Sequence, residues 1–395
     1  MSRVSRTSGT IRASGTSGTS RARDRRPLFD PEQSGRLAVQ AWVGSRLVLL
    51  ITVLALTWVN GWPFPRPLMQ WDVSHFADLA AKGYVTLTQS AFFPGMPLVL
   101  AAFKAIGVPY AVSGTLVSLV GSGFAAWALY RLAGSGPRGT LAVAAWSFAP
   151  MAVFTFVPYS EAAFCGFAFW GFWYAKQDRW GRAAILVAAA CLFRVSGLFM
   201  IGALVVLAVV GFKGTTWKRR LTRVAWMGVP SLVVAGYATF LRFRFGSWTV
   251  WFEAQRQGWG RSFDWPWDSF VATLHIAGVI GGKIYSTSAI FQWEVAAFVI
   301  GVLLTVWCVA TRKLPEAAWV AVQVLALSCQ IWLVSIARSM LLWFPLFGFI
   351  GQMSDASIPR LGLGTRRVIL VTLLGIETFA MIWWATRFFA GAWAG

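Results

Sequence analysis

Long apolar runs, separated by short clusters of basic residues, make up most of the chain after about residue 43. The runs lie at 43–60, 110–132, 139–157, 161–176, 182–196, 197–212, 224–241, 290–311, 316–335, 339–352 and 367–388. A helix that crosses a bilayer needs about 20 predominantly apolar residues, and most of these runs come near that length. The pattern predicts an all-α polytopic membrane protein with about 11 transmembrane helices.

The basic clusters fall at alternate boundaries between the runs. If the N-terminus is cytoplasmic, the inner turns contain Arg131, Arg138, Lys176, Arg179, Arg182, Lys213, Lys218, Arg219, Arg220, Arg223, Arg312, Lys313, Arg360, Arg366 and Arg367. Cytoplasmic loops carry an excess of Lys and Arg, so this spacing supports that orientation in the cell membrane. Two long segments, 61–109 and 242–289, then lie on the outer face, and we expect them to form interfacial helices.

Residues 1–37 differ from the rest of the chain. The tripeptide Ser-Gly-Thr recurs at 8–10, 14–16 and 17–19, and arginines are scattered between the repeats. This segment lacks the apolar periodicity that a folded core requires. We therefore expect a disordered basic cytoplasmic tail over 1–37 and one transmembrane domain over 38–395.

Composition agrees with a lipid-facing surface. Hydrophobic residues make up 57% of the chain and charged residues only 12%, about half the charged fraction of a soluble domain. The net charge of +21 would suit a nucleic-acid partner, but the positive-inside clusters account for it, so we expect membrane lipids and no nucleic acid. The four cysteines all lie in apolar runs and only two histidines are present, so we expect no metal site and no cofactor.

Asp72 is the acidic residue best placed for chemistry on the outer face. The segment from Asp72 to Lys82 has the apolar spacing of a short amphipathic helix, and Gly83 is a suitable stop. Asp72 and His75 lie three residues apart and would share one face of that helix. Asp72 could equally serve as the N-cap of the helix, which Asp does well.

Other polar residues on the outer face form a second group of candidates. Glu161 opens an apolar run, where it could cap a helix or bind sugar hydroxyls. Arg194, Arg261 and Arg338 could bind phosphate oxygens through their guanidinium forks, or they could snorkel or pair with Glu161 or Glu294. The remaining candidates for substrate contacts are Gln255, Tyr84 and Tyr159.

One outward carboxylate with several arginines suits transfer of a group from a lipid phosphate. A phosphate leaves as a stable anion, so the reaction needs one base for the acceptor hydroxyl and cations for the phosphate. The sequence contains no GxxxxGK[ST] motif and no DxD pair, which disfavours a P-loop ATPase and metal-chelated nucleotide-sugar chemistry. A lipid-linked sugar translocase without catalysis, or an assembly scaffold, would also fit these residues.

Several short motifs carry a resemblance to a known family. They are Trp71-Asp72…His75-Phe76, Gly83-Tyr84, Phe92-Phe93-Pro94…Pro97, Pro158-Tyr159-Ser160-Glu161, Arg194…Gly197 and Arg338…Phe344-Pro345. Their order and spacing resemble those of the bacterial PIG-V-like mannosyltransferases, relatives of GPI mannosyltransferase II within the GT-C class of glycosyltransferases. In relatives an Asn commonly stands where this chain has Ser196, so that contact is not carried over.

The resemblance implies a fold and a reaction. It implies a GT-C-like membrane domain, a polyprenyl-phosphate-mannose donor as co-substrate, a lipid or glycan acceptor, and inverting transfer on the outer face. It also implies that an aspartate early in the first outer loop is the catalytic base, and Asp72 is the matching position. His75 would orient Asp72 or touch the phosphate. The sequence leaves open the acceptor, whether the sugar is mannose, the linkage, any metal requirement, the exact number of spans and the oligomeric state.

Overall fold

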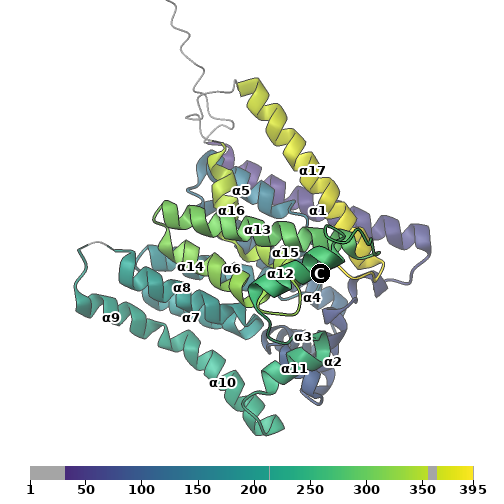
Figure 1. The fold of residues 1–395 in the computed structure, drawn as a ribbon, viewed down its shortest axis with the longest axis horizontal. Coiled ribbons are helices and arrows are strands. Elements are labelled where there is room, and N and C mark those ends of the chain that lie inside the picture. Colours follow the sequence, from purple (N-terminus) through teal and green to yellow (C-terminus); the bar gives the residue numbers. More distant parts are fainter. Residues whose placement is uncertain (1–31, 213, 355–362, 395) are drawn as a thin grey trace, which may run out of the picture.

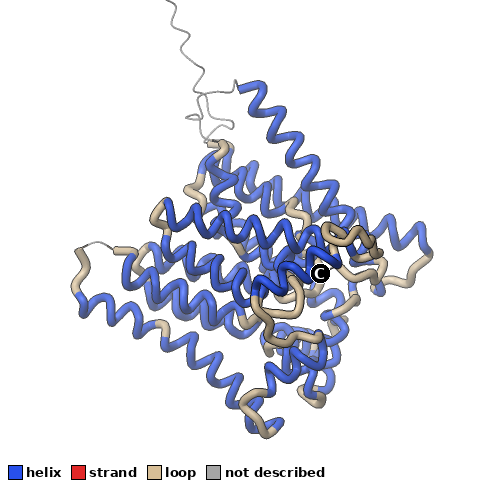
Figure 2. The backbone as a smooth tube through the Cα atoms, viewed as in Figure 1, coloured by secondary structure: helices blue, strands red, loops and turns tan. Residues whose placement is uncertain are grey.

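The computed structural model describes residues 32–212, 214–354 and 363–394. Within these ranges the chain consists of helices and connecting loops, and no strand occurs there (Figure 2). The longer elements are α1 (Ser34–Asn60), α4 (Tyr110–Leu132), α5 (Gly136–Ser147), α6 (Glu161–Lys176), α7 (Trp180–Phe193), α8 (Ser196–Val210), α9 (Trp217–Trp226), α10 (Gly228–Phe245), α13 (Ser288–Ala310), α14 (Leu314–Ser328), α16 (Phe344–Gln352) and α17 (Leu363–Phe389).

The shorter elements gather at one end of the bundle. They are η1 (Arg66–Leu68), α2 (Asp72–Lys82), η2 (Leu87–Ala91), α3 (Gly95–Ala105), η3 (Ala152–Thr155), α11 (Val250–Trp259), α12 (Pro266–Ile276), α15 (Ile336–Ser339) and η4 (Met340–Leu342). Figure 1 shows α7, α8, α14 and α13 side by side, with α2, α3 and α11 grouped beyond one end. The two long segments expected on one face, 61–109 and 242–289, therefore fold into short helices, and η2 packs on α11.

Five helical segments in the described ranges are long and apolar enough to cross a membrane. They are Ser34–Asn60, Tyr110–Leu132, Trp217–Phe245, Ser288–Ala310 and Arg367–Phe389. Shorter apolar helices, among them α7, α8 and α14, pack between them. The chain is therefore a multi-pass, all-helical membrane protein. The total of about 11 spans stays a prediction.

The apolar run 139–157 is not one helix. Helix α5 ends at Ser147, and only the short turn η3 follows before α6 begins. Arg46 of α1 explains how this break is tolerated: its guanidinium donates to the carbonyls of Ser147 (3.1 Å) and Thr155 (3.0 Å) and to the Thr155 hydroxyl (2.7 Å). Carbonyls released by a broken helix are costly at membrane depth unless a side chain satisfies them.

The run 316–335 is also shorter as a helix than expected. Helix α14 ends at Ser328, and an irregular stretch leads to α15 and η4. Side chains from neighbouring elements satisfy its backbone. The Leu333 N–H donates to the Thr273 hydroxyl (2.8 Å), and the indoles of Trp146 and Trp319 donate to the carbonyls of Leu341 and Leu342 (2.9 Å each).

The expected basic turn at 176–182 forms ion pairs with α9 and with the start of α14, whereas Lys213 and Arg360 lie outside the described residues. Lys176 pairs with Glu316 (3.0 Å), and Asp178 pairs with Arg219 and Arg223 (2.7 Å each). This grouping is compatible with the predicted orientation, which stays a prediction.

The boundary expected for the N-terminal tail is four residues too late. Helix α1 begins at Ser34, which is fully buried and accepts a hydrogen bond from the Thr140 hydroxyl (2.7 Å) through its carbonyl. Residues 34–37 therefore belong to the folded domain. Residues 1–31 of the expected disordered tail lie outside the described residues.

Replacement of Arg46 by Met should destabilise the protein by about 3–5 kcal/mol, because three buried acceptors lose a charged donor. The measurement is the thermal unfolding midpoint in mild detergent. Arg36→Met is the matched control, since Arg36 is an exposed residue of the same helix. Equal midpoints for the two variants would contradict this role of Arg46.

Candidate active site

Asp72 is the first residue of α2, and its helix has the limits expected from the sequence, including the stop at Gly83. The N-cap position belongs to Trp71, and no side chain caps this end. The amides of Val73 and Ser74 donate instead to the turn carbonyls of Gln70 (3.2 Å) and Trp71 (3.0 Å). The capping role considered for Asp72 is therefore not what the structure shows, and its carboxylate is available for other contacts.

Trp71 adopts a strained backbone that fixes the start of α2. Its φ is 54° and ψ is −124°, a region that non-glycine residues rarely occupy. The Trp71 indole donates to the carbonyl of Ala392 (3.2 Å), and the Asp72 N–H donates to the hydroxyl of Tyr159 (3.2 Å). Strain of this kind is often found at functional sites, where surrounding contacts hold it in place.

Arg338 lies beside the Asp72 carboxylate. Its Nη1 is 3.6 Å from Asp72 Oδ2, and its Nε is 3.3 Å from Glu161 Oε1. The guanidinium carbon also lies over the rings of Phe154 and Tyr159, at 5.2 and 5.8 Å from their centroids. The cation is thus held between two carboxylates and two aromatic faces.

Glu161 joins Arg338 to Arg194. The Glu161 carboxylate is fully buried, and its Oε1 lies 2.6 Å from Arg194 Nη1. The same Nη1 donates to the Ser160 hydroxyl (3.1 Å). Of the two pairings left open for these arginines, the structure therefore shows Glu161 and not Glu294.

Two cavities meet at Asp72. The larger one, of about 320 Å³, is lined by Trp71, His75, Thr88, Tyr159, Ser335 and aromatic residues near the C-terminus. The smaller one, of about 110 Å³, is lined by Ser160, Arg194 and Gln255 together with Phe92, Phe93 and Trp251. Four residues line both cavities: Asp72, Trp259, Arg261 and Arg338. A group bound in one cavity would therefore face a group bound in the other across the Asp72 carboxylate.

Arg261 has only neutral hydrogen-bond partners. It donates to the side-chain oxygen of Gln255 (3.0 Å) and to the hydroxyl of Ser335 (3.4 Å). The buried Nε groups of Arg261 and Arg194 have no hydrogen-bond partner at all. Both arginines line the smaller cavity, so an anion bound there would lie beside two guanidinium groups.

Burial and neighbouring charges change the acidity of these groups. Burial raises the pKa of Asp72, and the opposing charge of Arg338 limits the rise. Burial also raises the pKa of Tyr159 well above its usual value, with a contribution from Asp72. Burial lowers the pKa of Arg261 to about 10, which still leaves it charged at neutral pH.

The other expected site residues are placed less uniformly. His75 lines the larger cavity, but its ring stacks on Phe92 (5.1 Å between centroids), and Arg338 is the charged group nearest to the carboxylate of Asp72. Tyr84 lies outside both cavities. Its hydroxyl donates to the Phe92 carbonyl (2.7 Å), and its ring borders a separate apolar groove.

Some residues of the site were not anticipated. The hydroxyl of Ser335 accepts a hydrogen bond from Arg261, and the backbone of Ser335 has a positive φ of 64°. Phe388, Trp393 and Ala394 close one side of the larger cavity. The sequence offers no signal for the last three, because the final apolar run reads as a simple span. Trp259 was not among the expected site residues, yet it lines both cavities.

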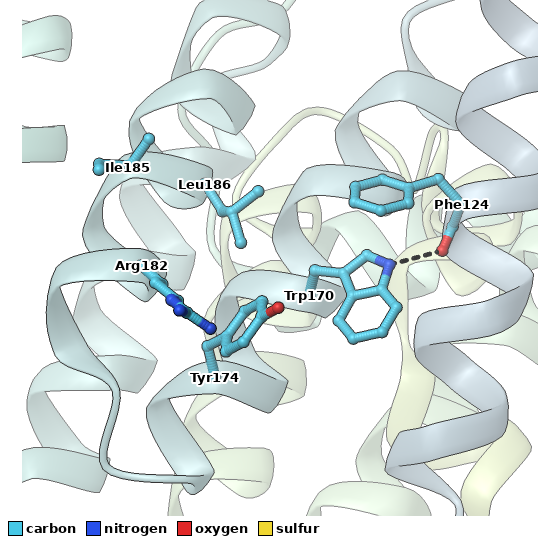
Figure 3. Close-up of a pocket in the computed structure, with 6 residues that line it drawn as sticks. All are labelled: Phe124, Trp170, Tyr174, Arg182, Ile185 and Leu186. Carbon is cyan, nitrogen blue, oxygen red and sulfur yellow. Dashed lines mark hydrogen bonds between the residues drawn. The ribbon is translucent and has the colours of Figure 1, made fainter.

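A further pocket of about 320 Å³ lies between α4, α6 and α7 (Figure 3). Its walls are Phe124, Trp170, Tyr174, Arg182, Ile185 and Leu186, and the Trp170 indole donates to the Phe124 carbonyl (3.0 Å). No carboxylate lines it, so it offers no base for proton transfer. In the described residues no group of three His, Cys, Asp or Glu side chains is placed to hold a metal ion.

The fold and the site define a multi-pass helical membrane protein with an acid–arginine centre at one end of its bundle. No family model matches the chain. Over 187 residues the chain is 30% identical to the GPI alpha-1,6-mannosyltransferase 2 of Mus musculus. This alignment covers 42% of the chain and 38% of the mouse protein. The chain therefore aligns with well under half the length of that curated relative.

A solved structure gives a second comparison. The chain is similar to the crystal structure of ArnT from Cupriavidus metallidurans bound to undecaprenyl phosphate, with a TM-score of 0.48 and 13% identity. The similarity covers 86% of this chain and 70% of ArnT. At this identity and TM-score the comparison carries no information about chemistry.

Replacement of Glu161 by Gln should lower stability by about 3–5 kcal/mol, because Arg194 and Arg338 both lose a buried counter-charge. Glu316→Gln is the control: its pair with Lys176, whose side chain is 43% exposed, should be worth about 1 kcal/mol or less. Thermal unfolding midpoints in detergent measure both effects. A loss for Glu161→Gln no larger than that of the control would show that the network is not a structural centre.

Proposed function

We propose that this protein is a GT-C-like membrane glycosyltransferase. It transfers a mannosyl residue from polyprenyl-phosphate-mannose to a lipid or glycan acceptor on the outer face, with inversion at the anomeric carbon. The observation that carries the proposal is the position of Asp72, a carboxylate at the junction of two cavities, one of which is lined by Arg194, Arg261 and Arg338.

The smaller cavity suits the donor phosphate. The guanidinium groups of Arg194 and Arg261, which line it, carry the positive charge that a phosphate monoanion or dianion requires. Arg338, between the two carboxylates, adds a third cation at the junction. These charges stabilise the phosphate as it departs, so no general acid is required for the leaving group.

The larger cavity suits the acceptor. Its walls combine indole and phenyl faces with hydroxyl groups, a surface on which a sugar ring can stack and donate hydrogen bonds. Asp72 accepts the proton of the acceptor hydroxyl as that oxygen forms a bond to the anomeric carbon. The bond from the same carbon to the phosphate oxygen breaks, and its electron pair leaves with the phosphate.

An apolar groove beside the smaller cavity suits the lipid tail of the donor. It measures about 650 Å³ and is lined by α2, α3, α7 and α10. Phe93, which lines the smaller cavity, packs its ring on Tyr237 of the groove at 4.6 Å between centroids. This aromatic pair thus links the lining of the arginine-lined cavity to that of the apolar groove, a surface that suits isoprenoid units.

The sequence comparison supports the nature of the transferred group. The stretch that is 30% identical to a mannosyltransferase is the reason to name mannose among the sugars that a polyprenyl phosphate can carry. Because the match covers 38% of the mouse protein, the acceptor of that relative is not carried over.

Replacement of Asp72 by Asn should reduce transfer of labelled mannose from polyprenyl-phosphate-mannose by about 10²–10⁴-fold, the usual contribution of a general base. Asp78→Asn is the matched control, because Asp78 is on the same helix, is exposed and pairs only with Lys82 (3.4 Å). The control should retain wild-type activity.

Wild-type activity in a well-folded Asp72→Asn protein would overturn the assignment of the base. Movement of labelled lipid across vesicles without a new glycosidic bond would identify a translocase instead of a transferase. Both assays use the full-length protein in vesicles, so the two outcomes can be separated in one preparation.

Replacement of Gly236 by Leu tests the groove. Gly236 lines it, and a Cβ at this position meets no atom within 4 Å, so the new side chain enters the groove without a backbone clash. We expect KM for a long-chain donor to rise about tenfold, equivalent to roughly two displaced methylenes, with little change for a short-chain donor.

Gly228→Leu is the control for the groove. Gly228 is on the same helix, also has open space at its Cβ, and does not line the groove. An equal effect of both substitutions, or none of either, would show that the lipid tail of the donor binds elsewhere.

A further inference from the structure

Glu294 is a fully buried carboxylate whose hydrogen-bond partners are all backbone amides. It lies in α13, one helix away from the site. Its Oε1 accepts from the N–H of Ser335 (2.9 Å), and its Oε2 accepts from the N–H groups of Ile336 (2.8 Å) and Ala337 (3.0 Å). These amides open the short helix α15 and would otherwise be unpaired in a buried setting.

The segment held by Glu294 carries two groups of the site. Arg338 is the next residue after the three bound amides, and Ser335 provides the hydroxyl that accepts from Arg261. Ser335 also has the positive φ of 64°, a conformation that local contacts must maintain. The backbone position of this segment therefore sets the positions of both guanidinium groups.

We propose that Glu294 is a positioning residue that holds Arg338 against Asp72 and orients Arg261 through Ser335. The expected effect of Glu294 on the reaction rests on the proposed function. The role of Glu294 in holding the segment 335–338 rests on the structure alone. Glu294 touches neither cavity, so it acts through Arg338 and Arg261 and not on the substrates.

A carboxylate is the group that this arrangement requires. Three amides converge on two oxygens, and each oxygen can accept two hydrogen bonds when the group is ionised. A glutamine keeps one accepting oxygen and presents an NH₂ group to the remaining amides, where two donors face each other. Glu294→Gln therefore preserves volume while it removes one or two of the three bonds.

Displacement of Arg338 has an effect on Asp72 that a general loss of packing would not produce. The groups that face Asp72 are Arg338 from α15, Glu161 from α6, His75 from α2, Arg194 at the end of α7, Arg261 after α11 and Tyr159 before α6. Arg338 is the largest of the charges that hold the pKa of Asp72 down. If it moves away, the pKa of Asp72 rises, and the base becomes deprotonated only at higher pH.

The test compares full-length wild-type protein, Glu294→Gln, and the control Gln292→Leu. Gln292 is two residues away on the same helix. Its side-chain amide donates to the Ala277 carbonyl (2.9 Å) and not to a group of α15. We expect Glu294→Gln to lower kcat/KM by about 10–100-fold, as for a small misplacement of a catalytic group. We also expect the acidic limb of its pH–rate profile to move to higher pH, while the control keeps the wild-type limb.

A double-mutant cycle separates positioning from general damage. If Glu294 acts through Arg338 and Arg261, then Glu294→Gln combined with Arg338→Gln should lose clearly less kcat/KM than the product of the two single losses, because only the effect through Arg261 remains to be added. Multiplying effects would overturn the proposal. So would a folded Glu294→Gln protein with wild-type kcat/KM and an unshifted acidic limb.

Hydrogen exchange tests the same contacts without any enzyme assay. In Glu294→Gln, the amides of a peptide that covers 330–342 should exchange faster, with little change elsewhere in α13 and α14. Unchanged protection there would overturn the proposal even if no transferase activity is found. If Glu294→Gln does not fold, Glu294→Asp is measured in its place: it keeps the charge but shortens the reach, and should give the same local increase in exchange.

Failure of the proposed function gives a different pattern. A wild-type protein that transfers no mannose, but in which Glu294→Gln loses protection over 330–342, would contradict the transferase and leave the positioning role intact. Normal transfer by the wild type, with neither altered exchange nor altered kinetics in the variant, would contradict the positioning role alone.

Discussion

The shared ion pair of Glu161 with Arg194 and Arg338 is the interaction on which the site depends. A fully buried carboxylate is unfavourable unless cations and hydrogen bonds compensate its charge. The two arginines that do so come from distant parts of the chain, one at the break between α7 and α8 and the other on α15. Glu161 itself begins α6. The ion pairs thereby hold together the break between α7 and α8, the short helix α15 and the start of α6.

These interruptions are possible because side chains replace the missing backbone partners. Arg46 serves the carbonyls at the end of α5 and in η3, while Trp146 and Trp319 serve those of η4. Glu294 serves the amides of α15. In a membrane protein, irregular backbone is tolerated only where such partners exist, so the residues that permit the breaks are as necessary to the site as those exposed in it.

The sequence was informative about the elements that depend on local pattern. Most of the apolar runs correspond to helices, and α2 has the start and stop expected from Asp72 and Gly83. Hydropathy did not reveal the helix breaks, since it is as high over 139–157 as in a continuous span, although Pro150 is a helix-stop signal three residues after the end of α5. The sequence gives no sign that Arg46, one arginine within an apolar run, binds the carbonyls released at this break.

The candidate site shows the same division. Asp72 could be singled out by elimination, because outward acids are few, and the resemblance named the same residue. Tyr84 was grouped with it by sequence proximity, but its hydroxyl satisfies the Phe92 carbonyl and its ring faces the apolar groove. The pairing of Glu161 with Arg338 and the cap formed by Glu294 depend on tertiary contacts between distant segments, and a single sequence contains no pattern that specifies them.

The two carboxylates of the site have different environments, and this difference supports the different roles proposed for them. Glu161 is completely buried and lies 2.6 and 3.3 Å from two guanidinium nitrogens, so its charge is already committed to the structure. The Asp72 side chain is 22% exposed, opens to both cavities and has one arginine contact at 3.6 Å. Burial raises its pKa and Arg338 limits that rise, a balance that suits the general base of the proposed reaction. One carboxylate organises the cations, and the other is free to react.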